Sequence, residues 1–208
     1  FFFVDDSFYL DKPEAMKFCA EINKRGLKVA YRVQTRADVL DREYTEALGS
    51  SGCYNVAIGV ESGADAILNV MHKDSDTNTT LDAINNIKRA GMRVQALMIV
   101  GNEGETDETI RQTKEFLKKA KPDILGATWD GLLLFPGTAV YHKAVKEGLV
   151  TDDFWDTRER VRTYKYTPEQ IAKWNADIAS WNWRSLLTHH IKHMETKIRR
   201  RPAGEFTS

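Results

Sequence analysis

Short apolar runs alternate with amphipathic stretches along the first 150 residues of the chain. The amphipathic stretches carry apolar residues at three- and four-residue spacing, which predicts helices, and glycine, proline or polar residues bound the apolar runs, which predicts strands. We expect strands over residues 1–6, 27–35, 54–61 and 92–101 and within 123–135. We expect helices over residues 13–25, 41–51, 78–90, 106–120 and 138–147.

Every predicted strand is followed by a predicted helix. Such alternation predicts an α/β fold with a parallel sheet and right-handed crossovers. The strands are apolar along most of their length, as expected when helices cover the outside of the sheet. No G-x-G-x-x-G follows the first strand and no Walker loop is present, which argues against dinucleotide and nucleoside-triphosphate binding.

The pattern changes after residue 150, where a polar and aromatic stretch leads to a second amphipathic segment. Thr167 and Gln170 form a predicted capping box, with Pro168 at the first helical position. Apolar residues then recur at helical spacing at Ile171, Trp174, Ile178, Trp181, Leu187, Ile191, Met194 and Ile198. We expect a C-terminal extension over 151–198 with one long amphipathic helix, and a disordered basic tail over 199–208.

Charge and cysteine content narrow the class of protein. The 208 residues carry 30 basic and 30 acidic side chains, so no overall charge directs the chain to nucleic acid or to an anionic membrane. The apolar runs are too short for a membrane span. Cys19 and Cys53 are far apart, which predicts no disulfide framework and favours a reducing, cytoplasmic compartment. The opening Phe1–Val4 run is typical of a buried strand entered midway, so we expect further residues upstream.

Polar or special residues end every predicted strand. In a parallel α/β barrel ligands bind at this carboxyl-terminal edge. Carboxylates there can hold an ammonium group or accept ribose hydroxyls, and arginine can hold a carboxylate as a fork. A ligand with an ammonium, a carboxylate, a sugar and a flat base would suit the edge. The residues are Asp5 and Asp6, Gln34 and Arg36, Glu61 and Ser62, Gly101 with the GNEGET loop, Asp130, and the turn Phe135-Pro136-Gly137-Thr138.

Five segments resemble radical S-adenosylmethionine (SAM) proteins in order and spacing. They are FFFVDDSF, YRVQTRADVL, GCYNVAIGVESGADAILNVMHKDSD, AGMRVQALMIVGNEGETDETI and LLLFPGTAVYHKAVKEGLV, with a weaker match at YKYTPEQI. The chain is most similar to the large group that often carries an upstream cobalamin-binding domain. The resemblance implies a partial (β/α)6 TIM-like barrel over residues 1–150, holding strands two to six and lacking the first β-α unit.

The resemblance also assigns roles to the residues at the strand ends. It implies that SAM is bound through its amino group by Asp5 and Asp6, its carboxylate by Arg36, its ribose by Glu61 and Ser62, and its adenine by Ile99 and Gly101, with Phe135 and Pro136 bordering the adenine. Local alternatives compete with three of these roles. Asp5 and Asp6 could instead cap the loop before the next helix. Arg36 could instead pair with Asp38 on the surface. Ser62 could cap the turn that follows its strand.

The chain departs from the family pattern in two places. Glu103 stands in the loop where the family usually has a proline. The C-x-x-x-C-x-x-C motif that holds the 4Fe-4S cluster does not occur in this sequence, and Cys19 and Cys53 cannot replace it. The motif follows strand one of the family, ahead of Phe1. We therefore expect the isolated chain neither to assemble the cluster nor to cleave SAM.

For the intact protein, the resemblance implies radical SAM chemistry. A reduced cluster would cleave SAM to a 5′-deoxyadenosyl radical, for oxidoreduction or methyl transfer. The cofactors implied are SAM, a 4Fe-4S cluster with ligands upstream, and cobalamin if its domain is present. An external electron donor would be the partner, and the substrate, a small molecule or a peptide, is not specified.

Two other functions stay open at this stage. Asp5, Asp6, Glu61 and Asp130 could bind a divalent cation in a barrel lyase or isomerase. Alternatively, the chain is a degenerate, non-catalytic barrel that binds a ligand or a partner. A sheet edge left open by a missing strand predicts self-association.

The C-terminal extension offers three weaker signals. We assign Trp174 and Trp181 to the core face of the helix. His189 and His193 have a metal-ligand spacing, but no further ligand completes a site. The basic run Arg199–Arg201 is short and the chain has no net charge, so we do not expect nucleic-acid binding.

Overall fold

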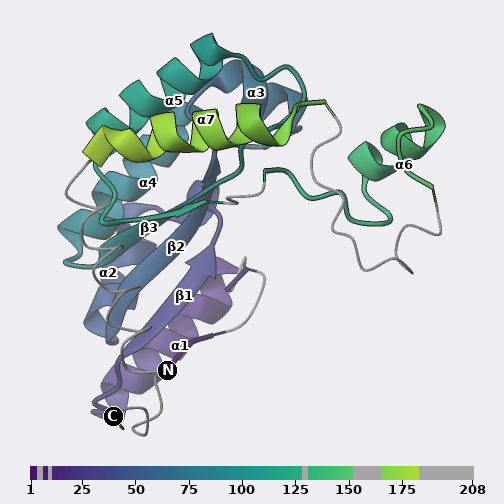
Figure 1. Cartoon of the computed structure of the whole chain (residues 1–208). Helices are drawn as coiled ribbons and strands as arrows, with labels where there is room; N and C mark the ends of the chain where they lie inside the picture. Colours follow the sequence, from purple (N-terminus) through teal and green to yellow (C-terminus); the bar gives the residue numbers. More distant parts are fainter. Residues whose placement is uncertain (4–6, 9–10, 128–130, 152–164, 183–208) are drawn as a thin grey trace, which may run out of the picture.

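The computed structural model describes residues 1–3, 7–8, 11–127, 131–151 and 165–182. Within these residues four parallel strands form one sheet in the order β1-β2-β3-β4, and helices connect each strand to the next along the chain (Figure 1). The strands are β1 (Tyr31–Thr35), β2 (Cys53–Glu61), β3 (Arg93–Met98) and β4 (Ile124–Ala127). Sequential order and parallel pairing are the arrangement of a β/α barrel wall, so the predicted α/β class is confirmed.

The helices confirm the predicted pattern, with one addition. They are α1 (Lys12–Lys24), α2 (Arg42–Ser50), α3 (Asp65–Val70), α4 (Thr77–Arg89), α5 (Asp107–Ala120), α6 (Ala139–Lys146) and α7 (Pro168–Ala179). A polar side chain caps most of them by accepting a backbone N–H in the first turn: Asp11, Asp41, Asp76, Thr106, Thr138 and Thr167. The short α3 begins after Ala64 without such a cap, so it lacked the usual start signal.

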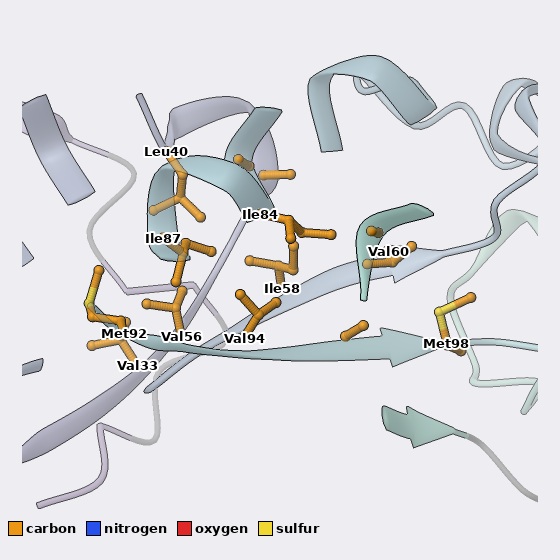
Figure 2. Packing of buried hydrophobic residues seen from close by; sticks show 14 of the residues in the cluster. Val33, Leu40, Val56, Ile58, Val60, Ile84, Ile87, Met92, Val94 and Met98 are labelled. Carbon is orange, nitrogen blue, oxygen red and sulfur yellow. The ribbon is translucent and has the colours of Figure 1, made fainter. Parts of the chain in front are cut away.

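The main core lies between the sheet and the helices on its outer face. Val56, Ile58 and Val94 are fully buried and pack toward Ile84 and Ile87 of α4 (Figure 2). Burying side chains of this size contributes about 1.5–3 kcal/mol each relative to leaving them exposed. The helical cover expected from the apolar strands is therefore present on this face.

The opposite face of the sheet is more polar than the uniformly apolar strands suggested. Burial alternates along β1 and β3, where Gln34 and Gln95 are half-buried between fully buried neighbours. Alternation follows from the two-residue period of a strand, so every second side chain leaves the core. The candidate site lies on this face, at the carboxyl-terminal ends of the strands.

Two predicted strands are described only in part. Phe2 forms an isolated parallel bridge to Arg32, and the Arg32 N–H donates to Phe1 O at 3.1 Å, so residues 1–3 run beside β1. Residues 4–6 lie outside the described part. Within the range 123–135, where the last strand was expected, β4 spans Ile124–Ala127, and residues 128–130 are outside the described part.

In the described part of the C-terminal extension, α7 lies beside α5 (Figure 1). Ile171, Trp174 and Ile178 are buried in the main core, which confirms the core assignment of Trp174. Trp181 is half-buried against the same core. The α-helix gives way to a 3-10 turn at Ser180–Asn182. The remainder of the long helix expected to residue 198, the histidines and the basic tail lie outside the described residues.

Among the described residues, no helix has both the length and the apolar character that a membrane crossing requires.

Candidate active site

A pocket of about 460 Å³ opens at the carboxyl-terminal end of the sheet. Its volume falls in the range of small-molecule sites. All four strands or the residues directly after them contribute to its walls. The lining residues are Ser7, Gln34, Thr35, Arg36, Gly59, Glu61, Lys73, Leu97, Met98, Ile99 and Gly126. Arg36, Glu61 and Ile99 of the predicted site therefore meet in one cavity.

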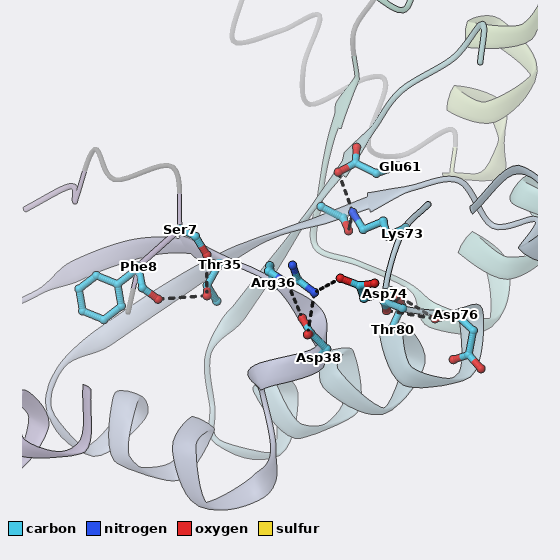
Figure 3. A network of polar contacts seen from close by, with 12 residues as sticks. Ser7, Phe8, Thr35, Arg36, Asp38, Glu61, Lys73, Asp74, Asp76 and Thr80 are labelled. Atoms are coloured by element: carbon cyan, nitrogen blue, oxygen red, sulfur yellow. Dashed lines mark hydrogen bonds and ion pairs between the residues drawn. The ribbon is translucent and has the colours of Figure 1, made fainter. Parts of the chain in front are cut away.

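Glu61 is held by a lysine that the sequence analysis did not select. Lys73 Nζ donates to Glu61 Oε1 at 2.9 Å and to the backbone oxygen of Gly59 at 2.7 Å (Figure 3). Both side chains are mostly buried, with 23% and 17% of their surface exposed. Lys73 lies in the turn after α3, and its own N–H donates to Leu68 O. The pocket therefore carries a partly desolvated ion pair.

The backbone at the end of β2 is irregular where it forms the pocket wall. The pairing of β2 with β3 shifts between Gly59 and Glu61, and Glu61 has φ of +61°. Left-handed backbone at a non-glycine residue costs on the order of 1–2 kcal/mol. A Cβ on Gly59 would lie 2.3 Å from Glu61 Oε1 and 3.0 Å from Lys73 Nζ. Glycine at this position therefore leaves the room in which the ion pair forms.

Arg36 lines the pocket and also makes the surface pair considered as its alternative role. Its Nε and Nη2 donate to the two carboxylate oxygens of Asp38 at 2.9 Å, and Nη2 also donates to Asp74 at 3.2 Å (Figure 3). Hydrogen bonding to Arg36 lowers the pKa of Asp38. The side chain is 43% exposed, so these pairs fix its position more than they stabilise the fold. Arg36 thus presents a held cation to the pocket.

Ser62 adopts the capping role rather than facing the pocket. Its hydroxyl accepts the N–H of Ala64 at 3.2 Å and lies 3.2 Å from Thr113 Oγ1 on α5. The neighbouring Gly63 donates to the same threonine hydroxyl at 2.9 Å. A Cβ on Gly63 would lie 2.6 Å from Phe116 Cβ, so α5 packs directly against this turn. Ser62 is therefore a buried structural contact, and its predicted ribose role has no geometric support here.

Gly101 lies after the pocket wall, in the GNEGET loop. The N–H of Gly101 and that of Asn102 both donate to Glu105 Oε2, at 2.6 and 3.2 Å. Burial raises the pKa of Glu105 to about 7, against the lowering effect of these two bonds. Glu103, the departure from the family proline, pairs with Lys143 of α6 at 2.6 Å. Gly101 is outside the pocket lining, whereas Ile99 is inside it.

Of the remaining predicted site residues, the structure describes Phe135 and Pro136. Phe135 and Pro136 are exposed beyond β4 and do not line the pocket. Asp5, Asp6 and Asp130 lie outside the described residues. The divalent-cation alternative is not favoured, because Glu61, the described member of its carboxylate set, is paired with Lys73. No group of three or more metal-binding side chains occurs in the described part of the chain.

The two cysteines do not fit a 4Fe-4S cluster. Both are free and buried, as expected for packing residues. Cys19 Sγ lies 3.9 Å from Tyr31 Oη, and Cys53 Sγ donates to Asn55 O at 3.4 Å. Burial raises the pKa of Cys53 to about 12, so its thiol stays protonated at neutral pH, whereas a cluster ligand must be a thiolate.

A parallel β/α wall with a pocket at its carboxyl-terminal edge is the arrangement of a β/α barrel, in which ligand sites lie at that edge. The family model of the radical SAM superfamily matches residues 1–117, which is more than half of the chain. The chain belongs to the radical SAM superfamily. This membership confirms the predicted resemblance, and SAM and a 4Fe-4S cluster are the cofactors expected for the family.

Individual relatives agree with this membership. An uncharacterized methyltransferase of Pyrococcus horikoshii is 29% identical over 175 residues, covering 82% of this chain and 38% of the relative. The anaerobic magnesium-protoporphyrin IX monomethyl ester cyclase of Rubrivivax gelatinosus is 30% identical over 131 residues, covering 62% and 23%. The chain thus spans well under half the length of either relative.

A solved structure shares the fold. The radical SAM methyltransferase TsrM of Kitasatospora setae, with cobalamin and a 4Fe-4S cluster bound, superposes with a TM-score of 0.63. The match has 19% sequence identity and covers 70% of this chain and 30% of TsrM. The likeness supports the partial-barrel architecture.

Proposed function

We propose that the pocket binds SAM and that the intact protein uses it for radical chemistry, in oxidoreduction or in methyl transfer to its substrate. SAM supplies the 5′-deoxyadenosyl group in this chemistry. The observation that carries the proposal is the Glu61–Lys73 pair beside Arg36 in one pocket. Two cations and a carboxylate in this space match the carboxylate and ribose hydroxyls of SAM.

Each described residue has a definite task in this proposal. Arg36 and Lys73 hold the SAM carboxylate, and Glu61 accepts a ribose hydroxyl. Ile99 and Leu97 offer apolar surface to the adenine. Gly126 leaves room for the ligand, because a Cβ there would fill space 2.9 Å from Leu97 Cδ2. Asp5 and Asp6 remain the proposed partners of the SAM ammonium group.

The relatives favour methyl transfer and a cobalamin cofactor. The Pyrococcus relative is named as a methyltransferase, and TsrM is a methyltransferase with cobalamin bound. The 4Fe-4S cluster is proposed to have its ligands outside this sequence, with an external electron donor. The substrate is a small molecule or a peptide. The free cysteines support a cytoplasmic location.

Equilibrium dialysis with SAM tests the proposal without requiring the cluster. Glu61→Gln removes the carboxylate while keeping its shape, and we expect the Kd for SAM to rise about ten-fold, since a charge-assisted hydrogen bond contributes about 1.5–3 kcal/mol. Glu43→Gln is the matched control, because Glu43 is exposed and pairs with Lys12 away from the pocket. Absence of SAM binding by the wild-type chain would reject the proposal.

A further inference from the structure

The loop after β3 is held from outside by a tyrosine of the C-terminal extension. The hydroxyl of Tyr166 is 3.1 Å from the carbonyl oxygen of Asn102 and 3.0 Å from that of Glu105, and it donates to this pair. Burial raises the pKa of Tyr166, so the hydroxyl keeps its proton at neutral pH. A residue more than sixty positions along the chain therefore closes the GNEGET loop.

Hydrogen bonds connect this loop to the pocket wall. Asn102 Nδ2 donates to Ile99 O at 3.1 Å, and the Ile99 N–H donates to Glu61 O at 3.0 Å. Both Ile99 and Glu61 line the pocket. Tyr166 thus reaches two pocket residues through Asn102. The links beyond the tyrosine hydroxyl are made by backbone and amide groups, which have few alternative partners when buried.

Tyr166 is itself positioned by the docking of α7. Its ring lies 4.8 Å from that of Trp174 in an edge arrangement, and Trp174 Nε1 donates to Asp107 in the first turn of α5. Lys173 pairs with the same carboxylate at 2.9 Å. Buried Trp174 fixes the helix against α5, so the tyrosine hydroxyl meets the loop in one geometry.

We infer that Tyr166 is a positioning residue for the SAM pocket, holding Ile99 and the Glu61 backbone in place through the Gly101–Glu105 loop. The inference rests on the proposed function, since it concerns SAM binding at this pocket. It gives the C-terminal extension a role in the site, although Tyr166 does not line the cavity. The substrate and the cluster take no part in it.

The test compares Tyr166→Phe with two controls in the full chain. Phenylalanine keeps the ring contact with Trp174 and removes only the hydroxyl. Tyr54→Phe is the matched substitution at an exposed strand position. Ile171→Val shortens a buried side chain of α7 that makes no bond to the loop, so it reports on the effect of lost stability alone.

Two readouts separate the positioning role from the SAM proposal. In Tyr166→Phe we expect amide hydrogen exchange of Gly101 and Asn102 to accelerate about five-fold and the Kd for SAM to rise about five-fold, the loss expected for one hydrogen bond. Neither control should change these values comparably. Unchanged exchange, or faster exchange with unchanged SAM affinity, overturns the inference. If the wild type fails to bind SAM, the proposed function is rejected, whereas exchange still decides whether Tyr166 holds the loop.

Discussion

Lys73 Nζ bridges the side chain of Glu61 and the backbone oxygen of Gly59, two residues apart on the same strand. The lysine comes from the turn after α3, so the pair ties that turn to the end of β2. Because both groups are largely shielded from water, their interaction is stronger than that of an exposed pair. The pair gives the pocket a cation and a carboxylate at fixed positions.

Lys73→Met should weaken SAM binding about ten-fold, because it removes a cation from the proposed carboxylate site and keeps the length of the side chain. Dialysis or calorimetry measures the Kd. Lys17→Met is the control, since Lys17 is exposed on α1 and pairs with Glu14. The double variant Lys73→Met with Glu61→Gln should lose less SAM-binding free energy than the sum of the losses in the two single variants. Full additivity would contradict a shared role.

Glu61→Gly and Glu61→Ala should differ in stability although both remove the carboxylate. Glycine adopts a φ of +61° without steric penalty, whereas the Cβ of alanine keeps the penalty that Glu61 has at this angle. We expect the glycine variant to have the higher free energy of unfolding by about 1 kcal/mol, measured by urea denaturation. Both variants should bind SAM more weakly than the wild type. Equal stabilities would show that the backbone at this position relaxes in the variants.

Glu105 should make the protein more stable as pH falls from 8 to 6. Its folded pKa of about 7 lies above the ordinary value of 4.5, so the folded state binds the extra proton in this window and stability is lost as pH rises through 7. The expected gain is about 1 kcal/mol between pH 8 and pH 6. Urea denaturation at both pH values measures it.

Glu105→Gln is the comparison that isolates this effect. All other titrating groups, including the Glu103–Lys143 pair and Tyr166 nearby, are shared by the two proteins. The difference in unfolding free energy between wild type and variant should therefore change with pH by the amount that Glu105 contributes. The opposite slope, with wild-type stability rising toward pH 8, would indicate that the two backbone N–H bonds outweigh burial.

The isolated chain is expected to self-associate. Phe1 and Phe2 lie beside the β1 edge with 84% and 48% of their surface exposed. Exposed apolar residues at a sheet edge favour pairing between chains. Light scattering should detect species larger than a monomer, and Phe1→Lys should reduce them. A monodisperse wild-type monomer with a cooperative melt would refute this expectation.

The sequence predicted the regular elements well because their signals are local. The predicted cap Thr167 marks a helix start, and the burial of Val56 and Ile58 follows from the apolar run that predicted their strand. The short α3 has no side-chain cap and only six residues, so neither a cap nor periodicity marked it. Local signals therefore account for what was found and for what was missed.

The site was harder to predict because its contacts join distant positions. Arg36 and Glu61 were found from their places at strand ends, and both line the pocket. Lys73 was missed, since only the turn after α3 brings it back to Glu61. Ser62 lies next to Glu61 yet bonds to Thr113 of α5. Glu61 and Ser62 are adjacent in the chain, but tertiary packing gives them different partners.

Backbone amide shifts on titration with SAM test the central claim most directly. A labelled sample of the wild-type chain reports each residue separately, so the site is located as well as detected. We predict that the amides of Gln34, Gly59, Ile99 and Gly126 shift in a saturable manner, because these residues line the pocket. No saturable shifts, or shifts confined to residues outside the pocket, would contradict the assignment of this cavity to SAM.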